Sequence, residues 1–264
     1  YRAPCRRGQS SAGARSMKAL LLDLGNSRWK FALSQGLAIG QVEDGAYSEL
    51  AALRAAVQSN ADQLETILLA SVVDKQTTDA VTAVLHRACA LPVRRISSTD
   101  RMPDLTAGYL KLEQLGVDRL LAMVAARART RRPLCVVDAG TAVTVDFVDA
   151  GGLHLGGFIL PGYRLFRECL LANTSIPRDA QVDEAALLGR DTPTAVALGA
   201  RYSVAGLVER FSTGSAALFP GQDVQIFVGG GDAGAISGLL PDACIRLDEL
   251  VLQGLAVVAA SKES

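Results

Sequence analysis

Two short turns of the same kind, each built on an aspartate and a glycine, constrain this chain more than any other feature. The first reads Asp23-Leu-Gly-Asn-Ser and the second Asp138-Ala-Gly-Thr-Ala. Each turn follows an apolar run and precedes a second strand-like stretch. Such a turn brings backbone N–H groups up to a phosphate and lets its Asp face a cation. Two of them in matching contexts predict a duplicated nucleotide-binding core.

The first turn carries small donors and then basic side chains. Gly25 permits a tight backbone, and Asn26 and Ser27 supply small polar groups. Arg28 and Lys30 alternate along the following stretch, so they share one side of a strand. A base on that side could neutralise the charge of a transferring phosphate. Taken alone, the same residues could form a β-hairpin with a solvated basic face.

The second turn carries hydroxyl groups in place of bases. Gly140 again permits close approach, and Thr141 and Thr144 are hydroxyl donors. Asp138 could hold a cation, because carboxylate oxygens are the ligands that hard cations prefer. Asp146 alternates with Thr144, and we interpret it as a surface charge. The second turn therefore predicts a phosphate or cation wall without its own positive charge.

A third glycine element, residues 229–232, lies between a predicted strand and a predicted helix and would let an adenine or ribose lie against backbone. It is a weak signal by itself. It is not a Walker loop, because no Gly-Lys-Ser/Thr follows, and no Rossmann Gly-x-Gly-x-x-Gly is present. A bound nucleoside triphosphate would therefore sit in a different cradle.

Composition narrows the class of protein. Lys plus Arg equals Asp plus Glu, at 27 each, which argues against nucleic acid or an anionic membrane as partner. The five cysteines form no Cys-x-x-Cys pair, which is typical of reduced thiols in a cytoplasmic protein. No apolar run reaches the roughly 18–20 residues that span a bilayer. We expect residues 1–16 to be a disordered extension and no secretory signal.

The order of elements predicts the fold class. Strand, turn and strand, followed by alternating strands and helices, occurs twice. We expect an α/β protein of two RNase H-like halves, residues 17–130 and 131–264, each a mixed sheet flanked by helices. The cleft should lie between the halves, with one Asp-Gly turn on each wall. This plan resembles the actin-like ATPase fold.

Motifs along residues 17–258 resemble one family within the acetate and sugar kinase, heat-shock ATPase and actin superfamily. The motifs are Asp23-Leu-Gly-Asn-Ser-Arg-Trp-Lys30, Gly116-Val-Asp-Arg119, Asp138-Ala-Gly-Thr-Ala-Val-Thr144 and Gly156-Gly-Phe-Ile-Leu-Pro-Gly162. Together with the helix start at Asp191-Thr192 they resemble type III pantothenate kinase. The resemblance implies ATP-dependent phosphorylation of pantothenate to 4'-phosphopantothenate, the first step towards coenzyme A.

The same resemblance assigns site residues. It implies that Asp118 is the proton acceptor and that Asp138 is the ligand of a monovalent cation, K⁺ or NH₄⁺. It implies that Asp23 faces the Mg²⁺ that accompanies ATP. ATP-binding residues implied by the family are Asp23, Leu24, Gly25, Asn26, Ser27, Arg28, Trp29, Lys30 and Thr141. Pantothenate-binding residues implied by the family are Tyr109, Gly116, Val117, Asp118, Arg119 and Thr192.

The chemistry of the Gly116–Arg119 motif fits these roles. Phosphoryl transfer requires alignment, charge stabilisation and a group that accepts the hydroxyl proton, and Asp118 near a helix start could be that group. Arg119 can grip a substrate carboxylate with two parallel N–H bonds. Without the other motifs, these residues would be an ordinary acidic helix N-terminus. Two residues depart from the family pattern: Ser27 stands for Thr, and Leu120 for Trp.

Two other functions stay open on the sequence alone. One is a different small-molecule kinase or phosphatase of the same superfamily, and the other is a non-catalytic regulator that senses nucleotide. The resemblance also implies a homodimer with substrate pockets near the interface. We expect the apolar helices 120–128 and 196–208 to contribute to that interface.

Overall fold

The computed structural model describes residues 18–174, 181–183, 185–214, 217–241 and 243–261. The extension predicted for residues 1–16 lies outside this part of the chain. Within it, no helix has the length and apolar character needed to cross a membrane.

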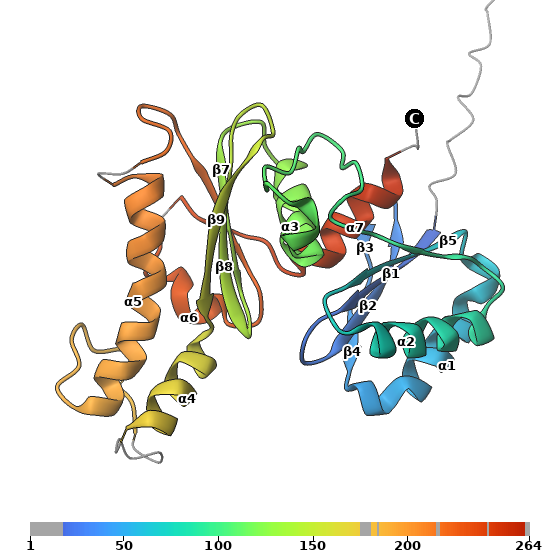
Figure 1. Ribbon diagram of the computed structural model, residues 1–264, viewed down its shortest axis with the longest axis horizontal. Coiled ribbons are helices and arrows are strands. Elements are labelled where there is room, and N and C mark those ends of the chain that lie inside the picture. Colours follow the sequence, from blue (N-terminus) through green and yellow to red (C-terminus); the bar gives the residue numbers. More distant parts are fainter. Residues whose placement is uncertain (1–17, 175–180, 184, 215–216, 242, 262–264) are drawn as a thin grey trace, which may run out of the picture.

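Two mixed β-sheets share one plan (Figure 1). The first has the order β3-β2-β1-β5-β6, with β4 also paired to β2, and the second has the order β9-β8-β7-β10-β11. In each, the leading strand pairs antiparallel with the next strand and parallel with a later one. The strands are β1 (Lys18–Leu24), β2 (Trp29–Gln35), β3 (Ala38–Ile39), β4 (Glu43–Gly45), β5 (Thr66–Ser71), β6 (Val93–Arg95), β7 (Leu134–Ala139), β8 (Ala142–Val148), β9 (His154–Pro161), β10 (Gln225–Gly229) and β11 (Ile245–Arg246).

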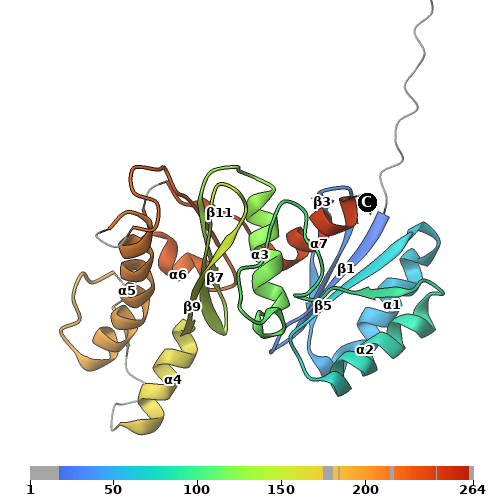
Figure 2. The ribbon, with the colours of Figure 1, turned by 45° about the horizontal axis from the view of Figure 1, so that its top comes forward.

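The helices form outer layers and a shared centre. Helices α1 and α2 cover the outer face of the first sheet, and α5 and α6 cover that of the second. Helices α3 and α7 pack along each other between the sheets (Figures 1 and 2). The helices are α1 (Leu50–Asn60), α2 (Lys75–Ala88), α3 (Val117–Arg127), α4 (Tyr163–Asn173), α5 (Thr192–Ser212), α6 (Ala233–Ser237) and α7 (Leu250–Ala260).

The leading strands are apolar on both faces because helices cover both faces. In β1, Leu20 and Leu22 pack on α1 and α2, whereas Leu21 faces the centre with α3 and α7. Side chains alternate along a strand, so Asp23 emerges on the same central side as Leu21. The same alternation in β7 brings Asp138 to the centre. The two aspartates thus face the space between the sheets.

The central helices touch through their backbones. Gly254 of α7 lies against the carbonyl of Leu121 in α3, with no room for a Cβ. Helix α7 comes from the second predicted half of the chain, but it also packs on β1 and β5 of the first sheet. The division of the chain at residue 130 into two domains stays a prediction.

Candidate functional site

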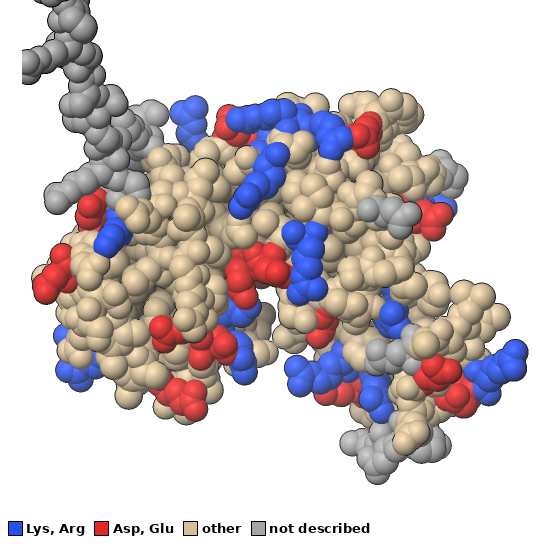
Figure 3. Space-filling view, turned by 180° about the vertical axis from the view of Figure 1, so that it is seen from behind, with Lys and Arg blue, Asp and Glu red and all other residues tan. Residues whose placement is uncertain are grey.

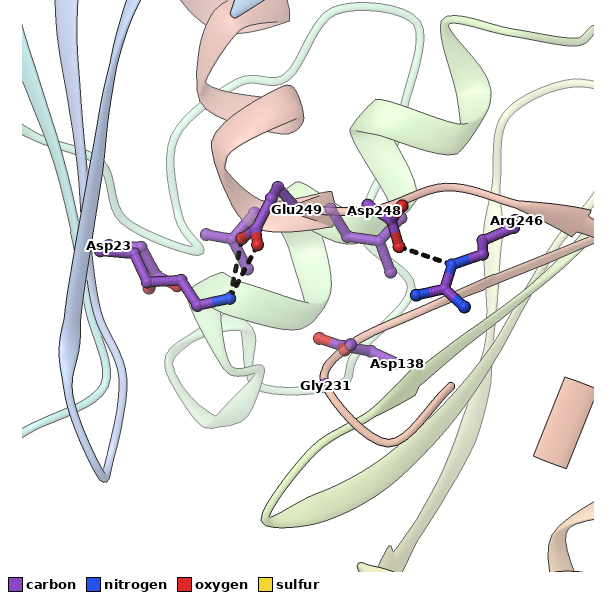
Figure 4. Close-up of a pocket in the computed structure, with 10 residues that line it drawn as sticks. Asp23, Asp138, Gly231, Arg246, Asp248 and Glu249 are labelled. Atoms are coloured by element: carbon purple, nitrogen blue, oxygen red, sulfur yellow. Dashed lines mark hydrogen bonds and ion pairs between the residues drawn. The ribbon is translucent and has the colours of Figure 1, made fainter. Parts of the chain in front are cut away.

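The two Asp-Gly turns form opposite walls of one cleft between the sheets. Both turns, α3 and the third glycine element line a cavity of about 350 Å³. The hydroxyls of Ser27 and Thr141 lie 3.3 Å apart, so the tips of the turns meet. A second cavity of about 380 Å³ adjoins the first, and Asp23, Lys30 and Asp138 line both (Figure 4). The cleft is large enough for a small-molecule ligand.

Hydrogen bonds hold the first turn from its own strand and from a neighbouring segment. The Gly25 N–H donates to the Arg28 carbonyl at 3.1 Å and closes the turn. The Tyr47 hydroxyl donates to the Gly25 carbonyl at 2.6 Å. The Arg28 side chain is exposed and forms an ion pair with Asp44 of β4. Thus the turn is braced, while Gly25, Asn26 and Ser27 line the cavity.

Three carboxylates gather in the cleft and disfavour one another's charge. Burial, followed by the charges of Asp118 and Asp138, raises the pKa of Asp23 to about 7. Burial, followed by the charge of Asp118, raises the pKa of Asp138 to about 6. Burial also raises the pKa of Asp118. Acidic side chains are visible from behind at the notch between the two halves (Figure 3). A cation in the cleft would favour the ionised forms of all three.

Lys30 is the basic group of the first wall, and it is held by a residue of the connection between β11 and α7. Its Nζ donates to both carboxylate oxygens of Glu249, at 3.0 and 2.8 Å (Figure 4). Glu249 precedes α7 and has a φ of 53°. A left-handed backbone at a non-glycine residue is uncommon and costs free energy. The connection from β11 to α7 therefore turns sharply to place a carboxylate in the cleft.

Asp118 enters the cleft from the first turn of α3. Gly116 is the N-cap of this helix, and a Cβ there would collide with the Asp118 carboxylate. The carboxylate accepts the backbone N–H of Arg119 at 2.8 Å. A larger residue at position 116 would therefore displace the Asp118 carboxylate.

Arg119 is turned away from the cavity into a buried network. Its Nε and Nη2 donate to the two carboxylate oxygens of Asp146, at 3.0 and 2.5 Å, and its Nη1 donates to the Tyr109 hydroxyl at 2.6 Å. The interpretation of Asp146 as a surface charge is wrong, because the residue is only 2% exposed. Helix α3 covers the central face of β8, and the guanidinium compensates the buried charge. The two-pronged edge of Arg119 is therefore occupied by Asp146.

The structure brings together many, but not all, of the residues predicted from the sequence. Those that line the cavity are Asp23, Gly25, Asn26, Ser27, Arg28, Lys30, Asp118, Asp138 and Thr141. The side chains of Leu24 and Trp29 lie in the core instead, so any contact with ATP would be through their backbone. Tyr109 and Arg119 are joined to Asp118 through the start of α3, but neither lines the cavity, nor do Gly116 and Val117. Thr192 lies at the start of α5, outside the cavity.

Sequence reasoning missed three residues that shape the site. His154 is buried against Asp146 and Tyr109. An aspartate inside an apolar strand could have signalled Asp146, since a buried charge needs a partner. No sequence signal marks Glu249, because its position depends on how β11 joins α7.

The cleft suits a cation that is bound partly by phosphate. Within the described residues, no group of three or more His, Cys, Asp or Glu side chains is arranged to hold a metal. Mg²⁺ is commonly held by one or two carboxylates together with substrate phosphates, and Asp23 offers such a carboxylate. Next to Asp138, Gly230 has a φ of 89° and leaves no room for a Cβ. The backbone thereby approaches that carboxylate closely.

Known proteins are similar to this chain over most of its length. The profile of the family described as "Type III pantothenate kinase" matches residues 19–213. A protein named "Type III pantothenate kinase" from Halorhodospira halophila is 36% identical over 89% of this chain and 95% of its own length. A protein of the same name from Pseudomonas syringae pv. syringae is 37% identical over 90% of this chain and 97% of its own length.

Solved structures agree with the fold. A "conserved putative Baf family transcriptional activator" from Campylobacter jejuni aligns with a TM-score of 0.59 at 21% identity, over 89% of this chain and 94% of its own. A "putative N-acetylmannosamine kinase" from Listeria monocytogenes aligns with a TM-score of 0.50 at 14% identity, over 92% of this chain and 98% of its own. The predicted fold class, two mixed sheets flanked by helices, is confirmed.

Proposed function

Since this chain belongs to the type III pantothenate kinase family, we propose that its cleft transfers the γ-phosphoryl group of ATP to the primary hydroxyl of pantothenate. The product is 4'-phosphopantothenate, on the route to coenzyme A. The proposal is supported above all by the opening of Asp118 into the same cavity as both Asp-Gly turns.

Asp118 is the proton acceptor in this proposal. The hydroxyl oxygen of pantothenate bonds to the γ-phosphorus as the bond from phosphorus to the bridging oxygen of ADP breaks, and the hydroxyl proton passes to the Asp118 carboxylate. Burial raises the pKa of Asp118, which brings it nearer to the working pH. Most of the remaining acceleration comes from alignment and charge stabilisation.

The turns hold the triphosphate. Backbone N–H groups of residues 26–28 and the hydroxyl of Thr141 face the phosphates, and Lys30 offsets their charge. Asp23 faces Mg²⁺ bound through ATP, and Asp138 holds K⁺ or NH₄⁺. When bound, these cations supply positive charge against the phosphates and relieve the repulsion between the two aspartates.

We also infer that the active species is a homodimer. Thr192, predicted to contact pantothenate, lies outside the cleft, so that contact requires α5 of a second copy. Strand β9 forms a sheet edge on which Leu155 and Ile159 are 45% and 64% exposed, and α4 buries none of its residues. Exposed apolar groups on an edge strand are typical of an interface.

The structure corrects one expectation about that interface. Residues 120–126 are buried against α7 within the chain, so this part of the predicted helix 120–128 cannot meet a partner.

The four cysteines that the structure describes are free thiols, which agrees with the reducing cytoplasm as the place of action.

Replacing Asp118 with Asn tests the proposed proton acceptor. We expect kcat for pantothenate-dependent ADP release to fall about 10²–10⁴-fold, with ATP binding retained. Asp79→Asn, at an exposed ion pair of α2, is the control and should keep wild-type activity. Undiminished activity of Asp118→Asn, or ATP turnover that does not need pantothenate, would contradict the assignment.

Replacing Ile159 with Lys tests the homodimer. A charge on the exposed edge of β9 should halve the mass measured by light scattering and lower pantothenate turnover, because Thr192 of the second copy is lost. Leu37→Lys introduces the same charge at a residue that is 59% exposed between β2 and β3. A wild-type protein that is monomeric and fully active would exclude the dimer.

A further inference from the structure

A closed ring of four side chains lies directly behind the start of α3. Asp146 of β8 accepts from Arg119, and Arg119 donates to the hydroxyl of Tyr109. The Tyr109 ring stacks on His154 with centroids 5.6 Å apart and planes 14° apart, and His154 Nε2 lies 3.0 Å from Asp146 Oδ1. The ring therefore returns to the residue at which it began.

Burial fixes which side chain donates and which accepts each hydrogen bond in this ring. The side chains of Arg119, Asp146 and His154 are 5%, 2% and 0% exposed. With its proton on Nε2, His154 donates to Asp146 and leaves on Nδ1 a lone pair, which has no partner. A proton on Nδ1 would be a buried donor without an acceptor, which is costly. His154 is thus set as a donor to Asp146.

The loop that carries Tyr109 is fastened to the same strand as His154. The Thr106 N–H donates to the Gly152 carbonyl, and the His154 N–H donates to the Thr106 carbonyl, both at 2.9 Å. A Cβ on Gly108 would collide with the His154 carbonyl. Helix α3 and the Tyr109 loop are therefore both held by β8 and β9 of the second sheet.

The ring also sets the direction of the Tyr109 hydroxyl. That oxygen accepts a hydrogen bond from Arg119, whose guanidinium lies 5.5 Å from the centre of the Tyr109 ring. The tyrosine's own hydrogen is then left to donate elsewhere, beside a positive charge. A donor of this kind suits an anionic acceptor such as a carboxylate.

We propose that Asp146 and His154 are positioning residues for pantothenate, which act by holding Arg119 and Tyr109 beside Asp118 so that Tyr109 donates to the substrate carboxylate. This inference rests on the proposed function. Arg119 then acts chiefly through Tyr109, because its two-pronged edge is taken by Asp146.

Two substitutions at His154 separate its two contacts. His154→Phe keeps a flat ring against Tyr109 but cannot donate to Asp146, whereas His154→Gln keeps a donor and loses the ring. We expect His154→Phe to lower kcat/KM for pantothenate about tenfold or more, since small displacements of positioned groups have large effects on rate. The KM for ATP should change less than twofold. The kcat/KM for the amide of pantothenate should fall much less than that for pantothenate itself.

Coupling to Tyr109 gives the sharper measurement. In a Tyr109→Phe background, His154→Phe should have little further effect on pantothenate kcat/KM, because residues that act as one unit are not additive. Gln225→Leu is the control. It removes a buried polar group of the same sheet that donates to the Ala243 carbonyl and takes no part in the ring. It should lower stability and leave the pantothenate KM unchanged.

The outcomes are distinct. Three results in an active wild-type background would overturn this inference. The effects of His154→Phe and Tyr109→Phe could be additive, or the His154 variants could leave the kinetic parameters for pantothenate unchanged per folded molecule. The third such result is a rise in the KM for ATP as large as that in the KM for pantothenate. A wild type without pantothenate-dependent ADP release would overturn the proposed function instead. Circular dichroism of each variant identifies loss through unfolding, and His154→Gln serves as the milder variant if His154→Phe is unstable.

Discussion

The two halves of the cleft share a topology and differ in what their turns carry. In the first, Asp23 pairs in register with Lys30 on the neighbouring strand, whereas in the second Asp138 pairs with Thr144. The first turn is closed by a bond from Gly25 to Arg28, and the second by a shorter span from Gly140 to the carbonyl of residue 142. One plan thus provides a basic wall and a hydroxyl-bearing wall for the same cavity.

The central helices repeat this contrast. Each follows the last parallel strand of its sheet and begins with a carboxylate near the cleft. In α3 it is Asp118, which faces the cavity, and before α7 it is Glu249, which binds Lys30. Equivalent places in the plan therefore hold carboxylates in different settings: one opens on the cavity, and the other is bound to a lysine.

The same substitution at two helix glycines should have opposite effects on stability. Gly254→Ala places a methyl group against the Leu121 backbone at the α3–α7 contact, and we expect a loss of about 1–3 kcal/mol in the free energy of unfolding. Gly206→Ala, in α5 with open space around it, should gain about 0.5–1 kcal/mol. Urea denaturation measures both. Equal effects would show that the central contact is looser than the structure has it.

The pH dependence of stability should differ between the two turns. An aspartate whose folded-state pKa is raised binds its proton more tightly in the folded than in the unfolded chain, so stability falls as pH rises from about 4 to the folded value. For Asp23 this loss extends to about pH 7, and for Asp138 only to about pH 6. Asp23→Asn should therefore flatten the profile up to a higher pH than Asp138→Asn does. Thermal unfolding across this range, without added cations, measures the profiles, and superimposable profiles would contradict the difference.

The pair between Lys30 and Glu249 should have the smallest effect on stability. It is about one-third exposed, so Glu249→Gln should change the free energy of unfolding by about 0–1 kcal/mol. The charge of Glu249 also contributes to raising the pKa of Asp23, and its removal should lower that pKa. NMR titration of the Asp23 carboxyl measures this shift. A rise would mean that Glu249 acts mainly by holding Lys30 in place.

Local pattern was enough to predict the frame of the site. The apolar run before the second turn and the strand-like stretch after it correspond to β7 and β8, and Thr192 does begin α5. Apolar runs, glycine turns and a proline in the first turn of a helix act over only a few residues. Alternation also placed Asp146 and Thr144 on one face correctly, since Thr144 lines the cavity and Asp146 binds Arg119 of α3.

What the sequence could not predict is what covers each face. An aspartate inside the apolar strand β8 could indicate burial, but nothing in β8 indicates that α3 and Arg119 lie over Asp146. Trp29 matched a family motif, yet its indole packs on Phe31 in the core. Such contacts join residues distant in the chain, and a single sequence gives no measure of them.

Asp23, Asp118 and Asp138 gather in one enclosed space. Repulsion between their negative charges lowers the stability of the ligand-free fold. Positive ions that enter the cleft relieve this opposition and bind only the folded chain, so they shift the folding equilibrium by mass action. Salt and nucleotide supply would then govern how long each molecule survives as well as how fast it turns over. For this enzyme, the lifetime of the folded molecule and its activity would depend on the same ions.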